Sequence, residues 1–264
     1  MAGMLRALWT YRGFILGSVM REFQVKYRNS LLGAAWSVIN PLSMIIVYTV
    51  IFSQIMRTRL QGVEGAFAYS IYLCAGILNW GLFAEIVNRG QNVFIEHANL
   101  LKKLNFPRLC LPVVVVASSG LNFAIIFGLF TVFLVISGNF PGFAFLGLIP
   151  VLALLVVFAI GLGITLGVLN VFFRDVGQLF GVVLQFWFWM TPIVYPVSIL
   201  PKSLQQMMQF NPMAQLTAAC QTILVHGRWP DWFSLLPVLA LSLLLGVMGL
   251  RLFRRHAGEM VDEL

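Results

Sequence analysis

Charged residues are absent from long stretches of this 264-residue chain, and that absence restricts the folds open to it. Only 10% of the residues are charged. A helix of about 20 apolar residues spans the ~30 Å hydrocarbon core of a bilayer. Uncharged runs of about that length or longer occupy 29–56, 65–84, 109–173, 176–201 and 233–250, and the sequence Ser137–Gly142 divides the longest run.

These runs predict an all-α polytopic membrane protein with a single transmembrane domain. A hydrophobic content of 60% excludes a soluble globular domain. We expect four further segments: an N-terminal amphipathic interface helix at 5–28, a cytoplasmic loop at 89–110, an outer re-entrant helical hairpin at 197–232 and a cytoplasmic tail at 252–264. The six expected transmembrane helices lie near 32–56, 66–88, 112–137, 144–170, 176–196 and 233–251.

The basic residues give the orientation of these helices. Most arginines and lysines fall on the side that holds both chain ends, whereas the other side holds Arg57, Arg59, Lys202 and Arg228. The positive-inside rule therefore predicts that the N and C termini are cytoplasmic. The net charge of +8 is explained by this topology and by contact with anionic headgroups, so no nucleic-acid partner is expected.

The segment 5–28 has an apolar arc when its side chains are placed at intervals of about 100°, as in a helix that lies in the interface plane. Arg12 falls inside this arc. Its guanidinium either snorkels to the lipid headgroups or faces a phosphate-bearing substrate that arrives sideways from the membrane. The other basic residues expected at substrate access lie toward the first span: Arg21, Lys26 and Arg28.

Two short-range charge pairs are expected to be structural. Glu85 and Arg89 are four residues apart, so they share one face of a helix near the cytoplasmic surface. A proton-coupling role for Glu85 is the alternative, because a carboxylate near the hydrocarbon is often functional. Arg174 and Asp175 form the short junction between the fourth and fifth spans, where an acid suits the helix dipole.

The cytoplasmic loop contains a predicted short helix at 92–103 with one apolar side, which ends at the sequence Asn105-Phe106-Pro107. Such a helix either docks in the groove of a partner protein or rests on the lipid headgroups. The periodicity of the sequence is compatible with both alternatives.

Aromatic residues make up 14% of the chain, and they are densest from Phe186 to Trp189. Tryptophan and tyrosine commonly anchor a protein at the membrane interface, and aromatic rings also stack on the C–H faces of sugars. The aromatic residues that we assign to a translocation path are Tyr48, Tyr72, Phe186, Trp187, Trp189 and Tyr195.

The chain lacks the motifs of nucleotide, metal and hydrolytic chemistry. None of its four lysines follows a glycine, so there is no phosphate-binding loop of the Walker type. Neither H-E-x-x-H nor G-x-S-x-G occurs. Cys74, Cys110 and Cys220 form no C-x-x-C pair, so we expect neither a metal site nor a disulfide framework. We expect a chain that is not an enzyme and holds no cofactor.

Five sequence segments stand out along the chain: KYRNSLLGAAWSVINPL (Lys26–Leu42), LLKKLNFPRLCLP (Leu100–Pro112), NVFFRDVGQL (Asn170–Leu179), TPIVYP (Thr191–Pro196) and NPMAQL (Asn211–Leu216). In this order and with this topology, they resemble the membrane (permease) subunits of ABC exporters of the polysaccharide and polyol-phosphate class. Such exporters move O-antigens, capsules or teichoic acids. The resemblance covers nearly the whole chain.

The resemblance implies a homodimer in the bacterial inner membrane, with two copies of a separate ABC ATPase that bind ATP and magnesium. It implies a substrate glycan on a polyprenyl diphosphate, taken from the inner leaflet. The alternatives are an ABC exporter of another lipid or drug-like substrate and a stand-alone ion-coupled transporter. The resemblance also favours ATPase docking for the helix at 92–103, whose coupling residues would be Phe94, Glu96, His97, Asn99, Leu100, Lys102 and Lys103.

Overall fold

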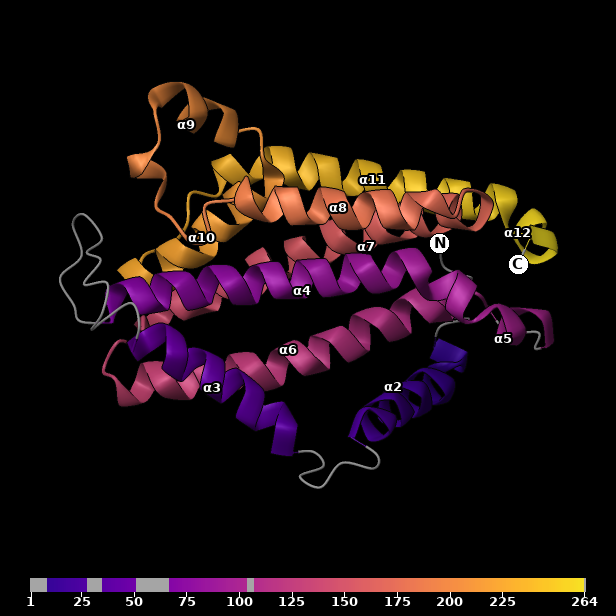
Figure 1. Ribbon diagram of the computed structural model, residues 1–264, viewed down its shortest axis with the longest axis horizontal. Helices are drawn as coiled ribbons and strands as arrows, with labels where there is room; N and C mark the ends of the chain where they lie inside the picture. The colour runs from indigo at the N-terminus through magenta and orange to yellow at the C-terminus, as the bar shows by residue number, and fades with distance from the viewer. Residues whose placement is uncertain (1–8, 28–34, 51–66, 104–106, 264) are drawn as a thin grey trace.

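The computed structural model describes residues 9–27, 35–50, 67–103 and 107–263, and these residues form helices and turns without a strand among them. The expected all-helical fold is therefore confirmed. Figure 1 shows an elongated bundle whose longer helices run mostly along its length. These longer helices are α2 (Arg12–Tyr27), α3 (Trp36–Val50), α4 (Ala68–Glu96), α6 (Cys110–Ile136), α7 (Leu148–Phe172), α8 (Asp175–Trp189), α10 (Pro212–His226) and α11 (Leu236–His256).

Shorter helices connect these elements. Three of them are single 3₁₀ segments: η3 (Gly142–Gly147), η4 (Val197–Ile199) and η5 (Phe233–Leu235). The short α-helices are α5 (Ala98–Lys103), α9 (Lys202–Met208) and α12 (Glu259–Glu263). In Figure 1, α5 and α12 lie at one end of the bundle, and α9 and α10 lie toward the opposite end.

Four helical segments of the described residues are long and apolar enough to cross a membrane, namely Ala68–Glu96, Cys110–Ile136, Gly142–Phe172 and Phe233–His256. They correspond to the second, third, fourth and sixth predicted spans. α3 and α8 have 15 residues each. At 1.5 Å per residue, such a helix is about 22 Å long, which is less than the ~30 Å hydrocarbon core. The first predicted span continues into 51–56, which lie outside the described residues.

The fifth predicted span is wrong at its C-terminal end. We expected a helix as far as residue 196, but α8 ends at Trp189 and the chain then turns. Pro192 and Pro196 lack an amide hydrogen, so neither can donate the bond that would extend the helix. The Thr191 hydroxyl donates to the Trp187 carbonyl at 2.8 Å and closes the last turn.

Glycines bring α7 close to its two main neighbours, α4 and α11. A Cβ on Gly167 would lie 2.6 Å from the carbonyl oxygen of Gly90 on α4. A Cβ on Gly161 would lie 2.8 Å from the amide nitrogen of Gly246 on α11. Small residues at helix contacts let the backbones of membrane helices approach closely. These contacts fix α4, α7 and α11 as the tightly packed centre of the bundle.

The predicted outer hairpin and cytoplasmic tail are each partly packed against the bundle. α10 contacts α4 and α7, whereas α9 has no buried residue. Asn211 caps α10 by accepting hydrogen bonds from the amides of Met213 and Ala214. At the other end, Met260 of α12 is buried in an apolar cluster with Leu101 of α5 and Phe253 of α11. The described part of the tail is therefore docked on the bundle.

Candidate functional site

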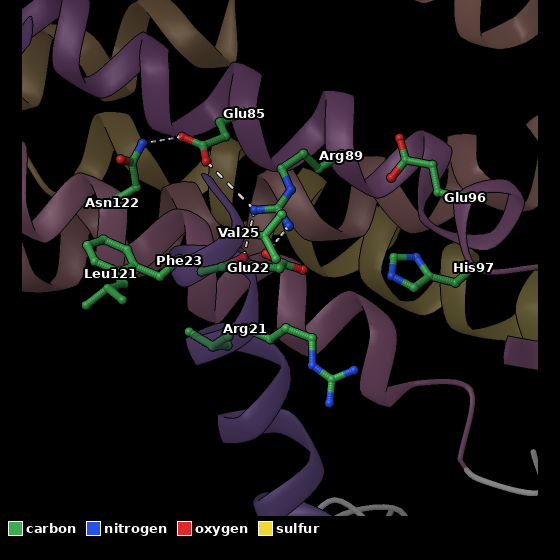
Figure 2. Close-up of a pocket in the computed structure, with 12 residues that line it drawn as sticks. Arg21, Glu22, Phe23, Val25, Glu85, Arg89, Glu96, His97, Leu121 and Asn122 are labelled. Carbon is green, nitrogen blue, oxygen red and sulfur yellow. Dashed lines mark hydrogen bonds and ion pairs between the residues drawn. The ribbon is translucent and has the colours of Figure 1, made fainter. Parts of the chain in front are cut away.

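A cluster of charged and polar side chains joins α2, α4 and α6. Nη2 of Arg89 donates to Oε2 of Glu22 at 2.6 Å, which ties α4 to α2. Nη1 of the same guanidinium donates to the Ser118 hydroxyl at 2.7 Å, which ties α4 to α6. The Asn122 amide donates to Glu85 at 3.0 Å. Figure 2 shows these side chains converging at the contact of the three helices.

The predicted Glu85–Arg89 ion pair is present, but it is the longer of the two pairs that Arg89 makes. The closest N–O distance between Glu85 and Arg89 is 3.9 Å, against 2.6 Å for Glu22 and Arg89. The side chains of all three residues are about one-third exposed. Sequence reasoning missed Glu22, although it is the sole acid among residues 1–28 and stands out in a basic segment.

A cavity of about 510 Å³ lies beside this cluster, between α2, α4 and α6. Arg21 lines it, but in Figure 2 the Arg21 guanidinium points away from Arg89. Glu96 and His97 lie at the far end of the cavity, apart from the ion pairs (Figure 2). The polar residues that line the cavity are Arg21, Glu22, Glu85, Arg89, Glu96, His97, Ser118 and Asn122.

A second cavity, of about 300 Å³, shares Glu85 and Asn122 with the first and lies between α3, α4 and α6. Its walls are mainly apolar, and they include Met44, Ile77, Leu78, Leu82, Phe123 and Ile126. The cavity with charged side chains in its wall and the mainly apolar cavity therefore meet at the hydrogen bond between Asn122 and Glu85. An amphiphile has this combination of a polar and an apolar part.

The predicted access residues do not all gather at this site. Arg12 is exposed; its guanidinium lies 5.0 Å from the ring centroid of Trp9 and donates to the Trp9 carbonyl at 3.3 Å. Arg21 lines the larger cavity. The side chain of Lys26 and all of Arg28 lie outside the described residues. The described face of α2 also exposes Leu16 and Met20, at 63% and 60%.

The predicted coupling helix at 92–103 is two helices in the structure. α4 continues to Glu96, His97 forms its C-cap, and α5 begins at Ala98. Phe94 is fully buried and stacks on Phe253 with the ring centroids 5.5 Å apart, so in this chain it is a core residue and does not lie on the surface. A partner protein could still reach the exposed side chains. These are Glu96, Asn99 and Lys102, with Leu100 half-buried, and the side chain of Lys103 lies outside the described residues.

The C-terminal end of α4 is fixed to the junction of α7 and α8. The Asn170 amide donates to the carbonyl of Gln91 at 3.0 Å and to the side chain of Asn92 at 3.1 Å. Its oxygen accepts from the amide of Gly177 at 2.9 Å. Arg174 and Asp175 are both exposed at this junction, and none of the ion pairs of the described residues joins them. The amide of Asn170 thus holds the junction together.

The aromatic residues assigned to a path have different surroundings. Tyr72 is buried and donates to the carbonyls of Pro192 and Tyr195, so it anchors the turn after α8. Trp187 packs on Phe83 and donates to Asn211 at 2.8 Å. Tyr195 donates to the carbonyl of Trp189. Exposed rings are found at Phe186 and Trp189, with 67% and 60% exposure, and the side chain of Tyr48 lies outside the described residues.

Comparison with known proteins assigns the chain to a family. Residues 15–225 match the family described as ABC-2 type transporter. The chain belongs to the ABC-2 type transporter family. It is 30% identical, over 100% of both chains, to the O-antigen export system permease protein RfbA of Myxococcus xanthus.

Two further relatives of this ABC-2 type chain carry names of the same kind. The RfbA permease of Klebsiella pneumoniae is 30% identical over 89% of this chain and 88% of its own length. The polysialic acid transport protein KpsM of Escherichia coli is 18% identical over 92% of this chain and 93% of its own. The family match runs from within α2 to the end of α10, so it includes the Arg89 cluster and α5.

Proposed function

We propose that this chain is the membrane subunit of an ATP-driven exporter that moves a lipid-linked polysaccharide across the bacterial inner membrane. The observation that carries the proposal is the full-length match, at 30% identity, to a permease named for O-antigen export. The relative named for polysialic acid transport supports a polysaccharide as the substrate class. The proposed substrate is a glycan on a polyprenyl diphosphate, taken from the inner leaflet.

In the proposed topology, both termini and the end of the bundle with α5 and α12 face the cytoplasm. The excess of basic residues on that side supports this orientation. The α9–α10 end then faces outward. We propose six spans, in which α3 and α8 supplement the four longer helices and the bilayer thins locally around the short ones.

The proposed partners are a second copy of this chain and two copies of an ABC ATPase, which bind ATP and magnesium. α5 is the proposed ATPase contact, because it is short, terminal in the bundle and exposes Asn99 and Lys102. A single residue, His97, separates α5 from α4. A displacement of α5 by the ATPase would therefore be passed to a helix that is packed into the centre of the bundle.

The proposal is tested by deleting the gene and by purifying the tagged chain from its native membrane. We expect the deletion strain to lose surface polysaccharide and to accumulate polyprenyl-linked glycan inside the cell. We expect the tagged chain to co-purify with an ATPase. Accumulation of a different lipid would support another ABC exporter, and a chain that purifies alone and transports with an ion gradient would support an ion-coupled transporter.

A further inference from the structure

Arg89 is placed to hold an anion at the edge of a cavity. Nη2 of its guanidinium donates to Glu22 at 2.6 Å, and Nη1 donates to the Ser118 hydroxyl at 2.7 Å. The side chain is 32% exposed, so solvent and headgroups can reach it. Arginine binds carboxylate and phosphate oxygens with the same planar geometry and often with two hydrogen bonds. Either anion therefore fits the position that Glu22 occupies.

α2 is held to the bundle by few buried contacts, so the Glu22 carboxylate can leave. Val19 is the only described side chain of α2 that is buried. Leu16, Met20 and Val25 are each at least 60% exposed. The ion pair itself is one-third exposed, and exposed pairs are stabilised by only about 0–1 kcal/mol.

The charges around the cavity explain why Glu22 must leave before an anion binds. Near Arg89 there are two carboxylates, Glu22 and Glu85, because Glu96 lies at the far end of the cavity (Figure 2). Glu85 is held on its other side by the Asn122 amide at 3.0 Å. With Glu22 in place, the excess of negative charge at Arg89 repels an anion. Without Glu22, Glu85 is the one carboxylate left near the guanidinium, and Nη2 of Arg89 is released to bind another anion.

The apolar cavity adjoins this position on the other side of Glu85 and Asn122. Its lining by Ile77, Leu82 and Phe123 suits a hydrocarbon chain. A ligand whose phosphate lies at Arg89 would thus have its chain at an apolar wall between α3, α4 and α6. The two cavities are complementary to the two parts of one molecule.

We infer that the paired cavities are a binding site for a phosphate-bearing amphiphile, in which Arg89 receives the phosphate and Glu22 occupies its place in the unliganded protein. The inference rests on the proposed function, since the exporter's lipid diphosphate substrate is such an amphiphile. Beyond that function, it names Arg89 as the residue that binds the phosphate and Glu22 as the side chain that competes with the phosphate for Arg89. Departure of Glu22 also releases α2 from α4, so ligand binding loosens the helix that covers the larger cavity.

If Glu22 competes with the ligand for Arg89, substitutions of Glu22 and Arg89 should change the ligand affinity in opposite directions. Glu22→Gln keeps the shape of the side chain but removes the charge, so it should raise the affinity for a phosphate amphiphile severalfold. Arg89→Gln removes the receptor and should lower the affinity at least about tenfold, the range expected for a charge-assisted hydrogen bond. Arg89→Lys should fall between the wild type and Arg89→Gln, because lysine keeps the charge without the fork.

The experiment measures binding of farnesyl diphosphate to the purified full-length protein in nanodiscs of zwitterionic lipid. Two matched probes each lack one part of this ligand: farnesol lacks the diphosphate, and inorganic pyrophosphate lacks the hydrocarbon chain. Glu263→Gln and Arg251→Gln are the control variants, because both residues are exposed and lie away from the cavities. Unfolding temperatures of all variants show whether the fold is retained.

The inference is supported if Glu22→Gln binds farnesyl diphosphate more tightly and Arg89→Gln binds it more weakly, with the controls unchanged. It is overturned if both variants weaken binding equally, which a purely structural ion pair would produce. Equal binding of farnesol would contradict phosphate recognition, and equal binding of pyrophosphate would contradict the amphiphile. This assay needs neither the ATPase nor export, so it is independent of the gene-deletion test. If the purified protein binds farnesyl diphosphate as expected but the deletion strain keeps its surface polysaccharide, the binding site is supported and the proposed function is contradicted.

Discussion

Gly167 lies on α7 at its contact with α4 and has no room for a side chain. A Cβ there would lie 2.6 Å from the backbone oxygen of Gly90 and 3.2 Å from a ring carbon of Phe94. Neither group can move far, because Phe94 is fully buried and Gly90 is part of a packed helix. Gly167→Ala should therefore lower the free energy of unfolding by about 1–3 kcal/mol, as overpacking does elsewhere. Thermal unfolding in detergent measures this as a lower midpoint.

Gly128 on α6 is the matched control for this substitution. A Cβ at Gly128 would have no atom within 4 Å. Gly128→Ala should leave the unfolding midpoint unchanged or raise it, because alanine in a helix is favoured over glycine by about 0.5–1 kcal/mol. If both alanine variants lower the midpoint by the same amount, close backbone approach at Gly167 is not what limits the packing.

At the scale of single elements, the structure separates residues that build the end of α4 from residues that a partner could touch. Phe94→Ala removes a buried ring, so it should cost about 3–5 kcal/mol of stability in the chain itself. Thermal unfolding of the purified chain, without any ATPase, should show this loss. A wild-type midpoint in the Phe94→Ala variant would mean that this ring contributes little to the core.

Lys102→Glu should affect partner binding and leave the stability unchanged, because Lys102 is exposed on α5. The charge reversal should leave the unfolding midpoint unchanged and reduce the amount of ATPase that co-purifies with the tagged chain. Lys202→Glu is the control, since Lys202 is an exposed lysine of a short helix at the opposite end of the bundle. Equal ATPase recovery in both variants would exclude α5 as the contact.

The sequence predicts the existence of the long helices better than their ends. The uncharged runs match α4, α6, α7 and α11, because a span must exclude charge along its middle. α4 nevertheless continues past Arg89 to Glu96, because arginine is a good helix former and a charged side chain does not end a helix. The Glu22–Arg89 pair joins residues 67 positions apart, so helical spacing could not predict it.

At the scale of the whole molecule, the packing of α4, α7 and α11 leaves two different ends. α5 and α12 cover one end, where Met260 and Leu101 share an apolar cluster. At the other end, α10 is packed into the bundle while α9 has no buried residue. An exporter that receives energy from a cytoplasmic ATPase needs such a difference, with a docking surface on one side of the membrane only. The orientation of the bundle therefore decides whether α5 can act as proposed.

Cysteine labelling of intact cells tests this orientation. With the α9 end outward, a membrane-impermeant maleimide should label Lys202→Cys in whole cells, and should label Lys102→Cys only after the membrane is opened. Both positions are exposed, so the reagent can reach them from the adjoining solution. The native residues Cys74, Cys110 and Cys220 are buried and should give little background. Labelling of Lys102→Cys but not Lys202→Cys in intact cells would show the opposite orientation. α5 would then face away from the cytoplasm and could not contact a cytoplasmic ATPase, which would contradict the proposed coupling.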